Sequence, residues 1–156
     1  MITVNSDRLW SRIEALSRFT DPAKPWTRRA FDSQFAQGRA WLADEFKAAG
    51  LAVEVDVGGN LIGRTPGTGR SLGALVAGSH SDTVPAGGRF DGMLGLLAAL
   101  EAAQSIREQK VSLVHPLEVC SWDRFPCAPA SVRQCLRYSS SRTWRHQVFQ
   151  LSSTAG

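Results

Sequence analysis

The run Leu72-Gly-Ala-Leu-Val-Ala-Gly78 decides the expected fold, because it is continuously apolar and has the length of one strand. Such a run is typical of a sheet that is covered on both faces. Residues 92–109 are rich in Leu and Ala at helical spacing, and residues 113–119 are typical of a second buried strand. A strand, a crossover helix and another strand form a parallel unit. The sequence therefore predicts an α/β fold with a mixed, largely parallel sheet and flanking helices.

The residues before this unit predict two helices and a hairpin. Asn5 or Ser6 can cap a first helix, and its expected apolar face contains Leu9, Ile13 and Leu16, with Trp10 as a further candidate. A second helix should begin near Asp32 or Ser33 and end at Gly50, with its apolar stripe formed by Phe35, Trp41, Leu42 and Phe46. The alternation over 51–56, the turn at 58–60 and the partner at 61–64 predict a hairpin, followed by a loop over 65–71.

Length and composition limit the class of protein. With 156 residues and 43% hydrophobic content, the chain is long enough for one core. No run approaches the roughly 20 apolar residues that span a bilayer, and the first fifteen residues lack a signal-type apolar block. These features predict a soluble, cytoplasmic protein. Its three cysteines are an odd number without secretory context, which indicates reduced thiols.

The stretch Gly78-Ser-His-Ser-Asp-Thr-Val-Pro-Ala-Gly-Gly-Arg-Phe-Asp-Gly92 contains the residues that indicate chemistry. His80 should lie just past a strand, where a neutral imidazole can bind a metal and Asp82 can accept its other N–H. Asp91 should lie at the start of the next helix, where a carboxylate is favoured and can bridge two cations. From spacing alone, a structural histidine and a helix-capping aspartate remain open alternatives.

This stretch closely resembles the metal-binding segment of the zinc-dependent carbamoylases and allantoate amidohydrolases, a branch of the di-metal aminoacylase and carboxypeptidase-like metallopeptidase superfamily. The resemblance extends to Gly59-Asn-Leu-Ile-Gly-Arg64 upstream and His115-Pro-Leu-Glu-Val119 downstream, so it covers about residues 5–119. It implies the amino-terminal part of a di-metal, zinc-peptidase-like catalytic domain.

The resemblance also implies roles for three residues. His80 would be a ligand of one metal, Asp91 the carboxylate that bridges both, and Asp82 the catalytic-site residue that orients and polarises His80. Two divalent cations, zinc or manganese, would activate a water for attack on the carbonyl carbon of an N-carbamoyl amino acid, allantoate or a related ureido compound. The implied partner is thus a small molecule, without nucleic acid or membrane.

The sequence departs from the family directly after Val119. The family presents two adjacent glutamates there, a general base and a ligand, whereas this chain has Cys120-Ser-Trp-Asp-Arg-Phe-Pro-Cys127, with Asp123 as the one acid within reach. The later histidine ligands, the substrate-binding arginine and the domain that forms the family homodimer are also missing. We therefore expect an inactive amino-terminal fragment of the hydrolase. The alternative is a non-enzymatic fragment or pseudogene product with at most a weak metal site.

Residues 120–156 differ in composition from residues 1–119. The first 119 residues hold 13 Lys/Arg and 13 Asp/Glu, while the remainder holds five Arg, one Asp and all three cysteines. An out-of-frame reading after codon 119 would produce such a tail, and we take 1–119 as a partial catalytic domain. A disordered extension is a simpler alternative than a zinc site or a single-strand nucleic-acid binder. The zinc site would use Cys120, Cys127, Cys135 and His146, and the nucleic-acid binder would use the arginines with interleaved aromatics.

Overall fold

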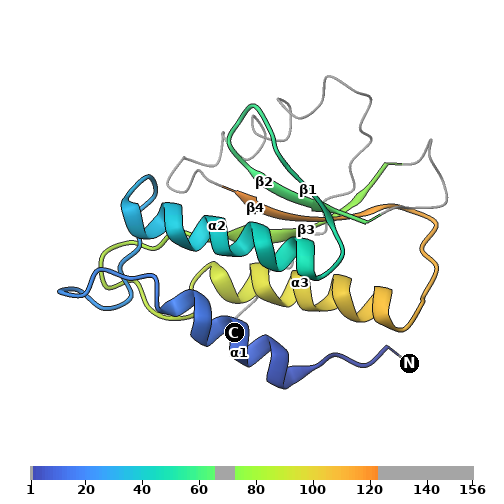
Figure 1. Ribbon diagram of the computed structural model, residues 1–156, viewed down its shortest axis with the longest axis horizontal. Coiled ribbons are helices and arrows are strands. Elements are labelled where there is room, and N and C mark those ends of the chain that lie inside the picture. Colours follow the sequence, from blue (N-terminus) through green and yellow to red (C-terminus); the bar gives the residue numbers. More distant parts are fainter. Residues whose placement is uncertain (1, 66–72, 123–156) are drawn as a thin grey trace, which may run out of the picture.

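Four strands form one mixed sheet in the computed structural model, which describes residues 2–65 and 73–122 (Figure 1). The antiparallel hairpin of β1 (Ala52–Val55) and β2 (Leu61–Arg64) forms one side of it. β2 pairs antiparallel with β4 (Leu117–Trp122), and β4 pairs parallel with β3 (Leu75–His80), which gives the order β1-β2-β4-β3. The predicted mixed sheet is confirmed, but its proportions differ: one of the three described strand pairs is parallel.

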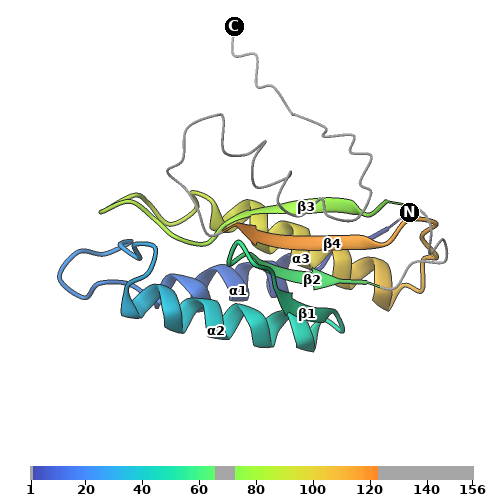
Figure 2. The same ribbon diagram turned by 90° about the horizontal axis from the view of Figure 1, so that it is seen from above.

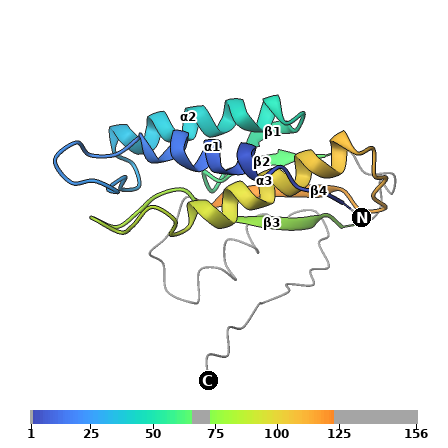
Figure 3. The same ribbon diagram turned by 90° about the horizontal axis from the view of Figure 1, so that it is seen from below.

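Three helices lie together on one face of the sheet (Figure 3). α2 (Ser33–Ala48) lies along β1 and β2, α3 (Met93–Glu108) lies along β3 and β4, and α1 (Ser6–Ser17) packs against both helices. The shared core is formed by buried side chains of helices and strands, among them Leu16, Leu42, Phe46, Leu61, Leu97, Leu100 and Val119. The strand–helix–strand unit β3–α3–β4 is therefore the predicted parallel crossover.

The helix boundaries follow local capping chemistry. The Asn5 side chain accepts from the Arg8 N–H at 2.9 Å, and the Asp32 side chain accepts from the Phe35 N–H at 2.7 Å. Each bond satisfies a backbone donor that has no partner within its helix. Gly50 follows α2 with φ of 79°, a conformation that favours glycine. These predicted starts and stops are confirmed.

Three expectations about burial and strand limits are wrong. Trp10 is 47% exposed and does not belong to the apolar face of α1. The described part of the next strand, β3, begins at Leu75 after Gly73 and Ala74, while Leu72 lies outside the described residues. Among the described strands β3 pairs with β4 alone, and Leu75 is 54% exposed, because the described helices cover one face of the sheet only. β4 begins at Leu117 rather than Leu113 and continues through Cys120 to Trp122, so the sheet does not stop at Val119.

Two loops lie side by side at the end of the sheet where β3 and β4 finish (Figure 2). They are residues 18–32, between α1 and α2, and residues 81–92, between β3 and α3. The Thr83 N–H donates to the Arg28 carbonyl at 2.7 Å, and the Thr83 hydroxyl accepts from the Arg28 N–H at 2.8 Å. The first loop therefore holds the second at the carboxyl ends of the parallel strands, where ligands bind in such sheets. Within the described ranges, no helix is long and apolar enough to cross a membrane.

Candidate functional site

His80 is the last residue of β3, opposite Trp122 of β4 in the parallel register. Its Nδ1 lies 3.0 Å from the Asp82 carbonyl oxygen and 3.1 Å from Asp82 Oδ1. Both oxygens are acceptors, so Nδ1 carries the proton and the neutral ring has its lone pair on Nε2. This is the tautomer in which a histidine binds a metal through Nε2 while a carboxylate fixes the ring.

Asp91 lies on the other side of the His80 ring. Its Oδ1 is 4.0 Å from His80 Nε2, and its side chain is 59% exposed. Two ligands of one tetrahedral zinc ion, each about 2.1 Å from the metal, would lie about 3.4 Å apart. An exposed carboxylate can close this small difference by rotation about its side-chain bonds, so one imidazole nitrogen and one carboxylate oxygen fit a divalent cation.

Gly92, the N-terminal cap of α3, fixes the distance between Asp91 and His80. A Cβ on Gly92 would lie 2.4 to 2.6 Å from three atoms of the imidazole ring, and its φ is 68°. The backbone therefore passes directly against the ring, which a larger residue would prevent. The glycine next to Asp91 thus serves the placement of both proposed ligands.

The hydrogen bond to the Asp82 side chain raises the pKa of His80 above its ordinary value, although partial burial acts in the opposite direction. Asp82 itself is buried, with 6% of its surface exposed. A buried carboxylate at this place favours a positive charge on the ring or on a cation bound to it. The electrostatics therefore agree with a cation site.

Residues that the sequence did not single out support the segment between His80 and Asp82. The hydroxyl of Ser121 donates to that of Ser81 at 3.1 Å, which links the ends of β4 and β3, and both serines are fully buried. The guanidinium of Arg28 donates through Nε to the Ser81 carbonyl at 2.8 Å. No periodicity or motif predicts a pairing between residues 28 and 81, because both lie in loops.

The three predicted residues come together, but they do not form a complete metal site. Among residues 2–65 and 73–122, no group of three or more His, Cys, Asp or Glu side chains is arranged to hold a metal. Cys120 is buried in β4. The other residues considered for the tail, namely Asp123, Cys127, Cys135, His146 and the tail arginines, lie outside the described residues.

Known proteins resemble about three quarters of this chain or more. It is 38% identical over 120 residues to the N-carbamoyl-L-amino acid amidohydrolase of Geobacillus stearothermophilus. This match covers 76% of this chain and 29% of the relative. It is 35% identical over 117 residues to the ureidoglycolate hydrolase of Oryza sativa subsp. japonica, with coverage of 74% and 24%. A crystal structure of a hydantoinase/carbamoylase family amidase from Burkholderia vietnamiensis matches with a TM-score of 0.76 at 34% identity, covering 84% of this chain and 33% of that one. No protein-family model matches the sequence.

The fold, the His80 to Asp91 segment and these likenesses define the class as α/β amidohydrolases. Within that class, the chain belongs to the hydantoinase/carbamoylase family, which confirms the resemblance seen in the sequence. It spans only 24% to 29% of the length of the two curated relatives.

Proposed function

We propose that His80, Asp82 and Asp91 form part of the site of a metal-dependent amidohydrolase. Its substrates would be N-carbamoyl amino acids, allantoate or related ureido compounds, which it would cleave at linear C–N bonds. The observation that carries the proposal is the His80 ring, held by Asp82 through Nδ1 and directed through Nε2 toward Asp91. The names of the relatives support the substrate class. The alternative of a non-enzymatic fragment is not favoured, because the curated relatives named above are hydrolases.

His80 and Asp91 would hold the cation, zinc or manganese in our proposal, and Asp82 would keep His80 in the required tautomer. A bound divalent cation supplies a Lewis acid for a carbonyl oxygen and lowers the pKa of a bound water. The residues themselves provide one neutral nitrogen donor, one anionic oxygen donor and a buried carboxylate that stabilises positive charge on the imidazole. Nitrogen and oxygen donors suit both metals.

Two ligands are fewer than the three protein ligands usual in a catalytic zinc site. We therefore also propose that the described residues do not support turnover by themselves, and that the remaining ligands come from other residues or from a second chain. The separation of residues 120–156 as a tail stays a prediction, apart from Cys120 to Trp122, which continue β4.

Metal binding and hydrolysis test the proposal separately. Equilibrium dialysis with Zn²⁺ or Mn²⁺ should show binding to the chain that falls at least about tenfold in His80→Ala. The matched control is His115→Ala, because His115 bonds to the Gly73 carbonyl and lies outside the site. Equal metal binding by wild type and His80→Ala contradicts the site.

The same three proteins are then incubated with N-carbamoyl amino acids, ureidoglycolate and allantoate, and ammonia release is measured. Turnover that is lost in His80→Ala and kept in His115→Ala supports the hydrolase and shows that further ligands are supplied. Metal binding without turnover supports the incomplete site. Turnover that survives in His80→Ala excludes this site as its origin.

A further inference from the structure

Arg28 is a buried cation next to the candidate site that the proposed chemistry does not use. Only 2% of its surface is exposed, although it lies in the loop between α1 and α2. Burial lowers the pKa of Arg28 to about 10, while attraction to the Asp82 carboxylate acts against this. The residue is therefore charged at neutral pH, and its burial costs free energy that its contacts must offset.

The guanidinium joins two elements that are distant in sequence. Nη1 donates to the carbonyls of Leu16 and Phe19 at 2.9 and 2.8 Å, at the carboxyl end of α1. The Leu16 carbonyl also accepts from the Phe19 N–H at 3.3 Å, and a cation is favoured at that end of a helix. Nε donates at 2.8 Å to the carbonyl of Ser81. The arginine thus connects the end of α1 to the residue between His80 and Asp82.

The main chain of Arg28 reinforces this connection. It exchanges two hydrogen bonds with Thr83, whose hydroxyl also donates to the Trp26 carbonyl at 2.9 Å. Ser81 is held on its other side by the hydroxyl of Ser121. Residues 81 and 83 are therefore fixed on both sides of Asp82, and the direction of the Asp82 side chain follows from them.

We propose that Arg28 is a positioning residue, which holds the Ser81 carbonyl so that Asp82 meets Nδ1 of His80. Its effect on metal binding or hydrolysis rests on the function proposed above, but its effect on the His80–Asp82 hydrogen bond does not. A rigid bond keeps the Nδ1 proton in place and leaves Nε2 as the donor nitrogen. A guanidinium suits this task because it donates in several fixed directions, which a lysine ammonium on a flexible stem does not reproduce.

The test is an NMR measurement of the Nδ1 proton of His80 in chain labelled with ¹⁵N-histidine. Arg28→Met should increase the rate at which this proton exchanges with water by at least about tenfold. Arg28→Lys should increase it by less, because lysine keeps the positive charge but cannot donate in the fixed directions of a guanidinium. His115, whose Nδ1 bonds to the Gly73 carbonyl at 2.8 Å, serves as the internal reference in each spectrum. If Arg28→Met does not fold, Arg28→Lys decides the question by the same measurement.

Arg12→Met is the matched control for the loss of a buried arginine. Arg12 is 5% exposed and bonds to Glu45, Glu101 and Gln104, away from residues 78–92. Exchange at His80 that rises only in the Arg28 variants supports positioning. Unchanged exchange in the Arg28 variants, or an equal rise in Arg12→Met, overturns it.

A dialysis measurement with Zn²⁺ separates this inference from the proposed function. Arg28→Met should weaken Zn²⁺ binding by about 10- to 100-fold, as the loss of other groups that orient a metal ligand does. If the wild-type chain binds no Zn²⁺ but Arg28→Met still speeds proton exchange at His80, the metal site is contradicted and the positioning role of Arg28 is supported. Wild-type binding that Arg28→Met leaves unchanged, with unchanged exchange, overturns positioning alone.

Discussion

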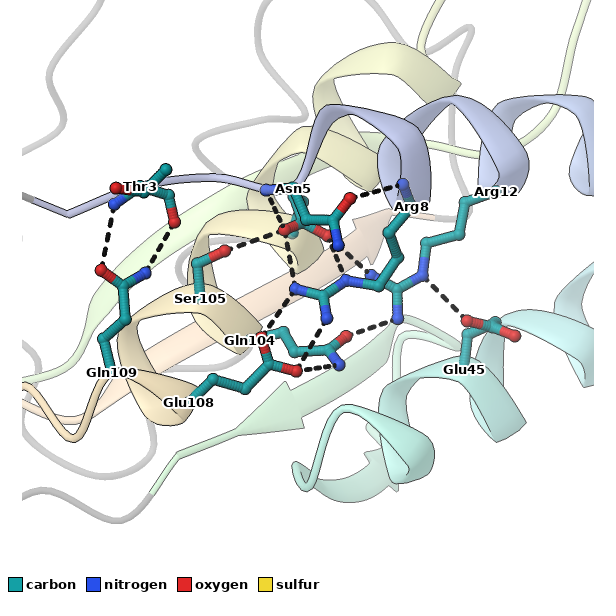
Figure 4. A network of polar contacts seen from close by, with 10 residues as sticks. Thr3, Asn5, Arg8, Arg12, Glu45, Gln104, Ser105, Glu108 and Gln109 are labelled. Carbon is teal, nitrogen blue, oxygen red and sulfur yellow. Dashed lines mark hydrogen bonds and ion pairs between the residues drawn. The ribbon is translucent and has the colours of Figure 1, made fainter.

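Two sets of charged side chains lie near the two ends of the helix pair α1 and α3, and they differ in whether their charges are paired. At the amino end of α1, Glu101 is 1% exposed and accepts hydrogen bonds from Arg8 at 2.7 Å, Arg12 at 3.2 Å, Ser105 at 2.8 Å and the Asn5 N–H at 2.9 Å (Figure 4). At the amino end of α3, His80 Nε2 and Asp91 are 4.0 Å apart, and Asp91 is exposed. In the first set, the carboxylate is paired with hydrogen-bond donors of the protein. In the second set, the distance between His80 and Asp91 leaves a position that a cation fits.

The difference agrees with a stabilising role for the Glu101 end and with the cation site that we propose for the His80 end. A buried carboxylate with all its donors nearby contributes to a rigid helix pair, because every charge is compensated. His80 and the exposed Asp91, which are 4.0 Å apart, gain little from each other without a cation. Changes at the Glu101 network should therefore lower the free energy of unfolding most, whereas changes at His80 should mainly alter binding.

Glu101→Gln should have the largest effect on stability. The substitution keeps the shape of the side chain but leaves Arg8 and the buried Arg12 without the carboxylate they face, which we expect to cost about 3 kcal/mol of unfolding free energy. Urea denaturation measures it. The control is Asp44→Asn, which removes an ion pair with Lys47 on the surface and should change stability by less than about 0.5 kcal/mol. Equal effects of the two changes would show that the network adds no stability.

The same network should make stability depend on acid. Hydrogen bonds from Arg8, the Asn5 N–H and Ser105 lower the pKa of Glu101 below its ordinary value of 4.5, although burial acts against them. Because the folded-state pKa is the lower one, this stability is fully present above about pH 4.5 and is lost as the pH falls through the folded pKa. Urea denaturation between pH 7 and pH 3 should show a steeper loss for wild type than for Glu101→Gln. Parallel curves would contradict this origin.

Gly92→Ala tests the end of the helix pair at which His80 and Asp91 lie. A Cβ there has no room beside the His80 ring, and the positive φ adds a strain of about 1 to 2 kcal/mol. Gly88→Ala is the matched control, because Gly88 also has positive φ, at 100°, but no atom within 4 Å of the added Cβ. Both variants should be destabilised, and only Gly92→Ala should shift the His80 signals in an NMR spectrum. Unshifted His80 signals would mean that the ring is not held by this contact.

Trp10→Ala should have the smallest effect. Trp10 is half exposed, and its ring lies 5.2 Å from the Arg89 guanidinium carbon and 6.2 Å from the Phe90 ring. An exposed contact of this kind contributes about 0.5 to 1 kcal/mol. Thermal unfolding should therefore change little. A loss as large as that of Glu101→Gln would place Trp10 in the core, as the helical spacing predicted.

Local features of the sequence predicted the order of the helices and strands, the helix boundaries and the site segment, but not the limits of β3 and β4. Capping side chains at Asn5 and Asp32, a glycine at the end of α2 and the turn before β2 act within a few residues, so a short window contains the information. The same holds for His80, at the end of β3, and for Asp82 and Asp91 in the loop that follows it. Their closeness along the chain is visible in the sequence, whereas their distance in space depends on how the loop is held.

Only the tertiary structure decided which side chains are buried and what holds the site loop. Helical spacing could not tell that Trp10 faces Phe90, nor could an apolar run tell that β3 lies last in the order of the described strands, because both depend on what packs beside them. The bond from Arg28 to Ser81 joins residues 53 positions apart. Such contacts arise when folding brings the loop after α1 to the ends of β3 and β4, and no local pattern encodes them.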